Sequence, residues 1–363
     1  MGNKIRVAIS GLGNCAKSLI EGVHYYRDAP DDEFVPGLMH VNFGGYRPRD
    51  IEFVAAFEIN SEKIGKDINE AIYADPNCAA PIIGNEKLQK SGYEVMPGPI
   101  SDGCASHMID PFHCYDPEKT KPVDVAEVLR SVKADMLVNY LPVGSNNAAR
   151  IYAQAALDAG VGFVNCIPEF IVSDDKWNKK FEEAGLPIAG DDIKSQVGAT
   201  IVHRVLADLL IRRGVKVEET YQLNIGGNTD FLNMTEENRL ITKRISKTEA
   251  VTSQVPYDIP VRIGPSDYVK FLGDKKICYI HIKGKKFGDQ PIYLNVKLGV
   301  EDSPNSGGVV IDVIRATKIA LDRNISGRLI SMSAYAFKHP PEQYPDSLAY
   351  QMVEDYIQGK RER

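Results

Sequence analysis

The sequence predicts an α/β fold in which a Rossmann-type, doubly wound parallel sheet carries an inserted α+β domain. Apolar strands alternate with helices along about the first 200 residues, which is the pattern of parallel βαβ units. After Gly214 the strands become alternating or β-branched, as in a mixed or antiparallel sheet. A clear amphipathic helix then returns at 307–323, so the C-terminal part should rejoin the first sheet.

The elements of the first domain follow from hydrophobic periodicity and from capping residues. Apolar runs predict strands, and apolar residues three or four positions apart predict helices. Ser145 is placed to cap one helix and Gly160 to end it. The predicted strands are 4–10, 51–57, 135–140, 161–166 and 186–189, and the predicted helices are 17–26, 123–132, 145–159 and 174–184. Segments 27–50 and 75–122 are rich in proline, glycine or charge and are expected to be irregular.

The domain boundaries follow from the change in strand character. We expect residues 1–200 to form the first domain, rejoined by 306–363, and residues 201–305 to form the second. Near the boundary, one face of a long helix carries Val197, Ile201, Val205 and Leu209. The second sheet is predicted from strands at 215–225, 277–282 and 291–300.

Composition excludes several classes of partner. With 43 Lys and Arg against 49 Asp and Glu, the formal net charge is −6, so no nucleic-acid partner is expected. No apolar stretch reaches the roughly 18 residues that a membrane span requires, and no signal peptide is evident. The six cysteines are scattered and form no CxxC pair, so we expect buried free thiols in a cytoplasmic protein. The histidines do not cluster at metal-ligand spacing, and the sequence assigns no metal ligands.

A glycine-containing turn between the first strand and the first helix predicts a dinucleotide site. Gly11 permits the tight turn, Gly13 lets the backbone approach a pyrophosphate, and Ala16 is small enough for helix and strand to pack. The helix that begins there presents free N–H groups to the phosphates. The predicted cofactor-binding turn therefore comprises Gly11, Gly13, Asn14, Cys15 and Ala16.

Two further polar residues end strands of this sheet. Glu58 follows the second strand and is the acid expected to bind the adenosine ribose, although the 27–50 insertion lengthens the usual spacing. An acid there repels a 2′-phosphate, so NAD is favoured over NADP. The alternative is a carboxylate that simply faces water. Asn139 ends another strand at the carboxyl edge, where ligands bind in such sheets.

A second constellation of polar motifs lies beyond the dinucleotide turn. GDDIKS at 190–195 is expected to open a helix at the domain junction, and NIGGNTD at 224–230 ends a strand. Lys243 and Lys247 share one helix face if 236–249 is helical. GDKK at 273–276, EDSP at 301–304 and Lys338 complete the set.

Together these motifs resemble the inositol-3-phosphate synthase family, also called myo-inositol-1-phosphate synthase. GDDIKS is similar to the family's GDD-x-KS motif, and NIGGNTD to its N-x-x-G-N-x-D segment. The resemblance covers nearly the whole chain, and the segments 35–50 and 303–308 are similar to the short bacterial and archaeal branch. The sequence departs from longer members in its less glycine-rich dinucleotide loop and in QVGAT after Ser195.

The resemblance implies conversion of D-glucose 6-phosphate to 1D-myo-inositol 3-phosphate, through NAD-dependent oxidation at C5, enolisation, aldol closure and re-reduction. It implies a homotetramer and allows a divalent or ammonium cation. The implied catalytic residues are Lys243, Lys247, Lys276, Lys338, Asp192, Asp230 and Asp302, and the implied substrate-binding residues are Ser195, Asn224 and Asn228. Lysines would stabilise phosphate, enolate and alkoxide charge, and the aspartates would orient them. The sequence does not decide which lysine acts at C5 and which at C1, and we favour Lys243 for the C5 step and Lys338 for the aldehyde oxygen.

Two other functions remain open on sequence alone. An ordinary NAD-dependent dehydrogenase would release NADH and would not need four lysines. A non-catalytic NAD-sensing protein would give no turnover, and such a regulator would usually carry a helix-turn-helix, which the sequence does not show.

Overall fold

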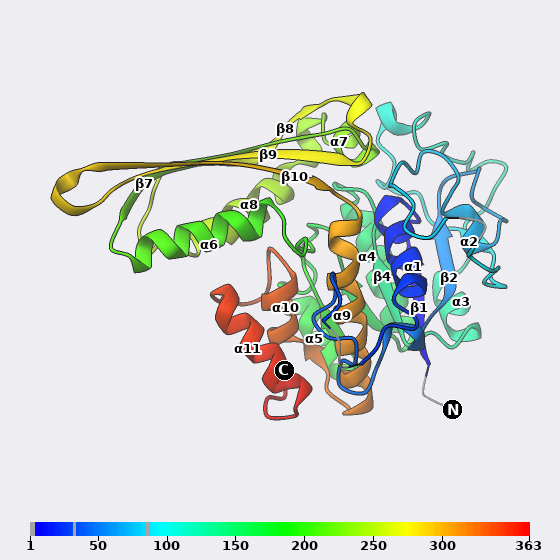
Figure 1. Cartoon of the computed structure of the whole chain (residues 1–363). Helices are drawn as coiled ribbons and strands as arrows, with labels where there is room; N and C mark the ends of the chain where they lie inside the picture. The colour runs from blue at the N-terminus through cyan, green and yellow to red at the C-terminus, as the bar shows by residue number, and fades with distance from the viewer. Residues whose placement is uncertain (1–3, 32–33, 85–86) are drawn as a thin grey trace.

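The computed structural model describes residues 4–31, 34–84 and 87–363, and two β-sheets organise them (Figure 1). The first sheet has seven parallel strands in the order β11-β6-β5-β4-β1-β2-β3. They are β1 (Ile5–Ser10), β2 (Ile51–Glu58), β3 (Val95–Pro97), β4 (Met136–Asn139), β5 (Gly162–Asn165), β6 (Pro187–Ala189) and β11 (Gly327–Arg328). The doubly wound order agrees with the predicted fold class.

Helices cover both faces of the first sheet because apolar side chains emerge from both sides of its strands. On one face a core forms with α1 (Asn14–Tyr25), α9 (Pro304–Asp322), α10 (Ile330–Ala336) and α11 (Asp346–Ile357). On the other a core forms with α3 (Val125–Ser131), α4 (Asn146–Ala159) and α5 (Asp175–Glu183). The C-terminal helices thus return to the first sheet. A short helix, α2 (Ile68–Ala71), follows β2.

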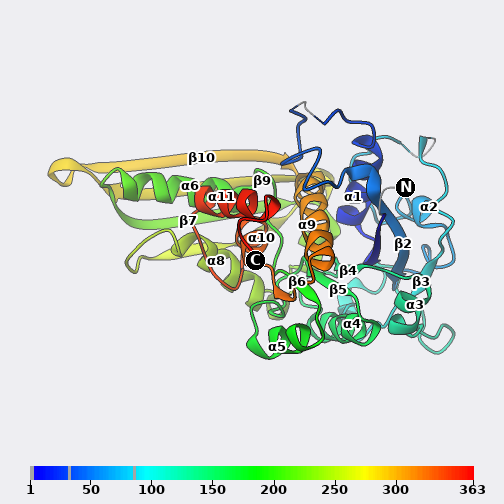
Figure 2. The same cartoon turned by 90° about the horizontal axis from the view of Figure 1, so that it is seen from below.

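The second sheet has four strands in the order β10-β9-β7-β8, and it extends as a long arm away from the first (Figure 1). The strands are β7 (Lys216–Gly226), β8 (Val261–Tyr268), β9 (Lys275–Lys285) and β10 (Pro291–Glu301). Only the β7–β8 pair is parallel among them. One face packs against α6 (Ala199–Arg212) and α8 (Ile241–Thr252), which lie along the arm in Figure 2, while α7 (Thr229–Asn233) follows β7.

The apolar stripe noted on α6 lies at the surface. Val205 and Leu209 are each half exposed, and Val197 precedes the helix. The buried side of α6 instead carries alanines, Leu210, His203 and Arg204. Hydrophobic periodicity predicted the helix but identified the wrong face as buried. The buried face includes polar side chains, His203 and Arg204, which hydrogen-bond to partners within the protein.

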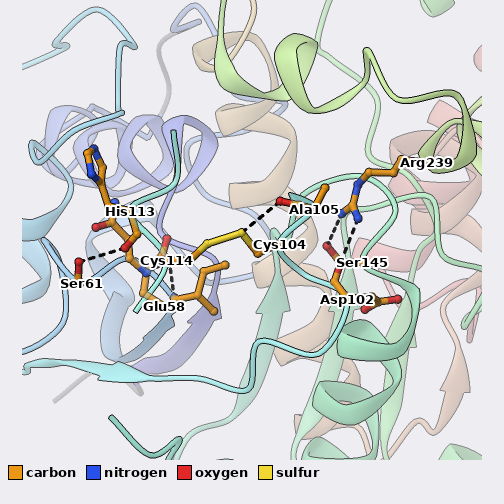
Figure 3. The surroundings of a disulfide bond; sticks show 11 residues. Glu58, Ser61, Asp102, Cys104, Ala105, His113, Cys114, Ser145 and Arg239 are labelled. Carbon is orange, nitrogen blue, oxygen red and sulfur yellow. Dashed lines mark hydrogen bonds between the residues drawn. A yellow bond between two sulfur atoms is a disulfide. The ribbon is translucent and has the colours of Figure 1, made fainter. Parts of the chain in front are cut away.

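The cysteines differ from the expectation of six buried free thiols. Cys104 and Cys114 form a disulfide in the irregular segment after β3 (Figure 3). Cys166 and Cys278 are free and buried, but Cys78 is exposed. Two single cysteines in a proline-rich segment carry no pattern that distinguishes a disulfide from free thiols, because pairing depends on how the chain folds. Across the described ranges, no helix combines the length and apolarity that crossing a membrane would require.

Candidate functional site

A cavity opens at the carboxyl edge of the first sheet, where the second sheet meets it. It lies beside the ends of β1 and β4, where the chain leaves one half of the sheet and begins the other, the usual ligand position in such folds. Every predicted site residue except Asn139 lines it. The fold therefore brings the glycine turn and the distant lysine motifs to one place.

The two glycines of the turn are required for different structural reasons. Gly11 has a φ of +86°, and a Cβ there would lie 2.7 Å from the carbonyl oxygen of Tyr140. Gly13 precedes the first turn of α1 and has no atom within 4 Å of an added Cβ, so it faces open space in the cavity. A phosphate group could approach the N–H groups of α1 there without meeting a side chain.

Glu58 anchors the glycine turn. Its carboxylate accepts hydrogen bonds from the backbone N–H groups of Leu12 (2.9 Å), Ile59 (2.7 Å) and Asn60 (3.1 Å). Lys63 lies 3.9 Å from the same carboxylate. Glu58 is thus neither a water-facing acid nor a wholly free ribose acceptor, because most of its acceptor capacity is already used.

A buried lysine that the sequence analysis did not single out fixes the other side of this turn. The Lys63 ammonium donates to the carbonyl of Leu12 (2.8 Å) and to Asn77 (2.9 Å). Burial lowers the pKa of Lys63, and Glu58 opposes that shift. Asn14 meanwhile accepts from the N–H of Cys78 (2.7 Å). No motif marks these contacts, which join segments far apart in the sequence.

Asn139 does not reach the cavity, which corrects its assignment as a cofactor ligand. It is fully buried, donates to Asn165 (2.9 Å) and accepts from Ser10 (3.1 Å). Asn165 in turn donates to Asp191 (2.7 Å). The asparagines tie neighbouring strand ends together beneath the site because their amide groups have donors and acceptors on both sides.

The disulfide loop forms part of the cavity wall, through Phe112 within the loop and Gly103 directly before it. Asp102 accepts from the N–H groups of Asn147 and Ala148, at 2.8 Å each, and so caps the start of α4. From the second domain, the Arg239 guanidinium donates to the carbonyl of Asp102 at 3.1 Å. The loop therefore links the two halves of the cavity.

Asp192 holds two of the predicted lysines. Its Oδ1 lies 3.1 Å from the ammonium of Lys243 and 2.9 Å from that of Lys338, and Ser246 donates to its other oxygen. Burial favours a higher pKa for Asp192, but the two ammonium groups outweigh it and hold the pKa well below its usual value. Asp192 is fully buried, so this charge pairing is strong.

The two lysines on Asp192 differ in pKa. Burial lowers the pKa of Lys338 to about 8, although Asp192 opposes the shift. Burial acts on Lys243 too, but Asp192 and Asp230 outweigh it and raise the pKa of Lys243. At neutral pH both are cations, and Lys338 is the one nearer to releasing its proton.

Lys276 and Lys247 complete the predicted lysine set. Lys276 pairs with Asp302 at 3.0 Å, which outweighs burial and raises the lysine's pKa. Lys247 lies on α8 one turn from Lys243, is almost fully buried, and has no carboxylate within ion-pair distance among the described residues. Burial and the neighbouring lysines lower the pKa of Lys247 well below its usual value, and no carboxylate in the described part of the chain pairs with it to oppose that shift as closely as Asp192 and Asp302 do for the other lysines.

Asp230 stands at the start of α7 and faces this lysine group. Burial raises its pKa, although Lys243 acts in the opposite direction. Asp274, which sequence reasoning missed, accepts from Ser303 (2.7 Å) and from Asn228 (3.0 Å), and burial also raises its pKa. It stands in the GDKK motif two residues before Lys276, so that motif was the available signal.

The predicted sugar-binding residues are partly engaged within the protein. Asn228 caps α7 by accepting from the N–H groups of Asp230 and Phe231. Asn224 donates to the carbonyl of Gly264 (2.9 Å). Ser195 lines the cavity but lies before the helix rather than in it, because α6 begins at Ala199. The described residues contain no group of three or more His, Cys, Asp or Glu side chains placed to hold a metal ion.

Comparison with known proteins gives a consistent set of relatives. The family model described as myo-inositol-1-phosphate synthase matches residues 198–303. The inositol-3-phosphate synthase of Corynebacterium glutamicum is 53% identical, over 97% of this chain and 98% of that protein. That of Mycolicibacterium smegmatis is 52% identical, over 98% of each. The crystal structure of a myo-inositol-1-phosphate synthase-related protein from Thermotoga maritima covers 98% of both chains, with 25% identity and a TM-score of 0.82.

Proposed function

Because this chain belongs to the inositol-3-phosphate synthase family, whose members make inositol phosphate from glucose 6-phosphate, we propose that it performs the full cycle within one cavity. In that cycle C5 of D-glucose 6-phosphate is oxidised and C6 loses a proton. C6 then attacks the C1 aldehyde, and C5 is reduced again. The product, 1D-myo-inositol 3-phosphate, is an isomer of the substrate, so no net oxidant is consumed. The observation that carries the proposal is the convergence of four lysines, one buried and three largely buried, on a cavity beside a dinucleotide-type glycine turn.

The residues of the glycine turn fit NAD. The open space at Gly13 and the N–H groups of α1 suit a pyrophosphate, and Glu58 disfavours a 2′-phosphate nearby. When bound, NAD would accept a hydride from C5 and later return it. Tyr140, Cys166 and Ile167 line the same cavity as this turn and the lysines. They would keep water from the reacting carbons.

The polar end of the cavity suits a sugar phosphate. Ser195 and the first residues of α6 line it, and helix N–H groups together with ammonium groups are the usual partners of a phosphate dianion. Lys276, held by Asp302, remains a cation for this purpose.

We assign the proton transfers by the charge state of each lysine. Lys247 has its pKa lowered well below the usual value by burial and by the neighbouring lysines, so it is the lysine best suited to accept the proton that leaves C6. Lys243, fixed on Asp192, is a cation and suits the oxygen at C5, where negative charge develops. Lys338 suits the C1 aldehyde oxygen, because its pKa of about 8 allows it to donate a proton as the ring closes.

The proposed assembly is a homotetramer formed through the second domain. The face of its sheet that lies away from α6 exposes Tyr221, Leu223, Tyr279 and Tyr293. Paired strands place these side chains side by side, and the Tyr221 ring stacks on His281 with centroids 4.9 Å apart. An apolar patch of this kind on an antiparallel sheet is typical of a subunit interface.

The activity test uses purified protein, glucose 6-phosphate and catalytic amounts of NAD. We expect a cyclitol phosphate to form without accumulation of NADH. Stoichiometric NADH without cyclitol would indicate an ordinary dehydrogenase. If neither NADH nor cyclitol phosphate forms, even with magnesium, zinc or ammonium present, the proposal is refuted. Lys276→Ala should lower kcat by about 100-fold. The matched control is Lys275→Ala, which removes the neighbouring exposed lysine on β9 and should leave kcat unchanged.

A further inference from the structure

Lys338 owes its position to a short backbone ladder. It follows α10 by two residues, and its N–H donates to the carbonyl of Asp192 at 2.7 Å. The N–H of Lys194 donates to the carbonyl of Ala336 at 2.7 Å, and Asp191 and His339 exchange two bonds of 3.1 Å. The lysine and its carboxylate partner are thus held in register by neighbouring backbone.

Lys194, the lysine of the GDDIKS motif, does not line the cavity, and its side chain contacts the end of α10 beside this ladder. Its side chain is 1% exposed. Its ammonium donates to the carbonyls of Ala334 (2.8 Å) and Tyr335 (3.2 Å) in the last turn of α10, and lies 3.3 Å from Asp346. A cation on the final carbonyls stabilises a helix end that otherwise has unpaired acceptors.

Asp346 connects this lysine to a second buried cation. Its other oxygen accepts from the Arg204 guanidinium at 2.9 Å, and Arg204 also donates to the carbonyl of Tyr344 at 2.6 Å. Gln343, which accepts from Arg204 at 3.0 Å, donates to the carbonyl of Lys338 at 2.8 Å. Helices α6, α10 and α11 therefore meet around the segment that carries Lys338.

The arrangement is costly, which points to a specific need. Burial and the charge of Arg204 lower the pKa of Lys194 to about 7, although Asp346 opposes them. Desolvating a lysine ammonium opposes folding, and an apolar side chain of similar size would avoid that cost. It would, however, leave two helix carbonyls and a carboxylate oxygen without their donor.

We propose that Lys194 is a positioning residue for Lys338: by binding the end of α10 and Asp346, it keeps the Lys338 ammonium on Asp192. This inference rests on the proposed function for its kinetic consequence. Its structural content, the contact between Lys338 and Asp192, is independent of any substrate.

The test compares Lys194→Met with Lys318→Met. Lys318 on α9 also loses ion pairs when substituted, at 3.3 Å to Asp135 and 2.9 Å to Asp322, but it lies outside the cavity wall. We expect Lys194→Met to lower kcat by about 100-fold, as misplacement by about 1 Å does, with little change in the affinity for NAD. Lys318→Met should alter thermal stability alone.

The pH profile separates positioning from simple loss of charge. If Lys338 leaves Asp192, its pKa falls, and the alkaline limb of kcat moves to lower pH. If Lys194 only contributed a nearby positive charge, its removal would move the limb slightly to higher pH. If Lys194→Met kept the wild-type kcat and its alkaline limb stayed in place or moved to higher pH, the inference would be overturned.

A crystal structure of Lys194→Met would measure the contact between Lys338 and Asp192 directly. We expect the distance from Lys338 Nζ to Asp192 to exceed hydrogen-bonding range, and an unchanged distance would overturn the inference even if wild type does not turn over glucose 6-phosphate. Should Lys194→Met not fold, Asp346→Asn removes the same ion pair with little change of volume. Wild-type kinetics and an intact Lys338 contact in that variant would equally overturn it.

Discussion

At the scale of single residues, adjacent carboxyl groups in GDDIKS have opposite pKa shifts. Asp191 is buried among neutral donors, including the N–H groups of Val172 (3.1 Å) and Ser173 (3.0 Å), and burial raises its pKa. Asp192 faces two ammonium groups, which lower its pKa despite burial. The two neighbours thus have different roles because their side chains contact different segments of the chain. Asp191 fixes a loop, and Asp192 orients Lys243 and Lys338.

Replacing Asp192 by Asn should expose the dependence of Lys338 on this carboxylate. Asp192 is the group that opposes the effect of burial on Lys338, so its loss lowers the lysine's pKa below about 8. In the proposed mechanism Lys338 must be a cation, so the loss of activity at alkaline pH should begin at a lower pH than in wild type. We expect the alkaline limb of kcat to move down by about one pH unit or more. A limb that stays in place would show that Asp192 does not control Lys338.

The two glycines of the turn predict separable defects. Gly11→Ala places a Cβ against a backbone carbonyl at positive φ, so it should destabilise the fold by about 1–3 kcal/mol. Gly13→Val places its side chain in open cavity, so it should leave the melting temperature unchanged and weaken NAD binding by about tenfold or more. Calorimetry and NAD titration measure both effects. Equal loss of stability in the two variants would contradict this division.

At the scale of elements, the disulfide loop connects cavity wall, helix cap and second domain. Asp102 caps α4, Arg239 reaches the loop from the second domain, and Phe112 faces the cavity. Ordering such a segment costs conformational entropy, and a covalent link between Cys104 and Cys114 reduces that cost.

Thiol titration of the unreduced, denatured protein should therefore find the four cysteines that are not paired. Cys104→Ser should lower the free energy of unfolding by about 2–4 kcal/mol under oxidising conditions. Cys278→Ser, a buried free cysteine, is the control whose thiol count falls by one without breaking the link. Six titratable thiols in wild type would refute the disulfide.

At the scale of the whole molecule, the glycine turn follows β1 of the first sheet, Lys276 lies on β9 of the second sheet, and Lys243 and Lys247 lie on α8, which packs beside that sheet. Neither sheet has a complete site, and Lys338 comes from a segment that returns to the first sheet after the second is finished. The long arm of β7, β9 and β10 (Figure 1) exposes Tyr221, Leu223, Tyr279 and Tyr293 on the sheet face that lies away from α6.

The tetramer prediction is tested on this face. Tyr221→Glu combined with Tyr293→Glu buries charge in the proposed interface, so the particle mass from light scattering should fall below that of wild type. Tyr25→Glu, an equally exposed substitution on α1, should leave the mass unchanged. A monomeric wild type would refute the assembly.

Most of the long elements were predictable from sequence because each repeats its apolar pattern several times. The exceptions are β8, α10 and α11, which were not predicted, and β8 contains Gly264 and Pro265, which interrupt a strand pattern. Strands β3 and β11 were missed because two or three residues are too short to show a period. The motif lysines were found because they stand in recognisable spacings. The partners of Lys63 and Lys194 were not found, because they lie far away in the sequence. Leu12 is 51 residues from Lys63, and the partners of Lys194 are 140 or more residues from it, beyond any local pattern.

The place of Lys338 near the end of the chain has a consequence for biosynthesis. Domains fold as they emerge during translation, N-terminal parts first. Helices α10 and α11, which bring Lys338 and Asp346, also complete the core that packs against α1 and the glycine turn. A chain released before this segment is made would therefore lack both Lys338 and a closed core, so we expect such fragments to be unstable as well as inactive.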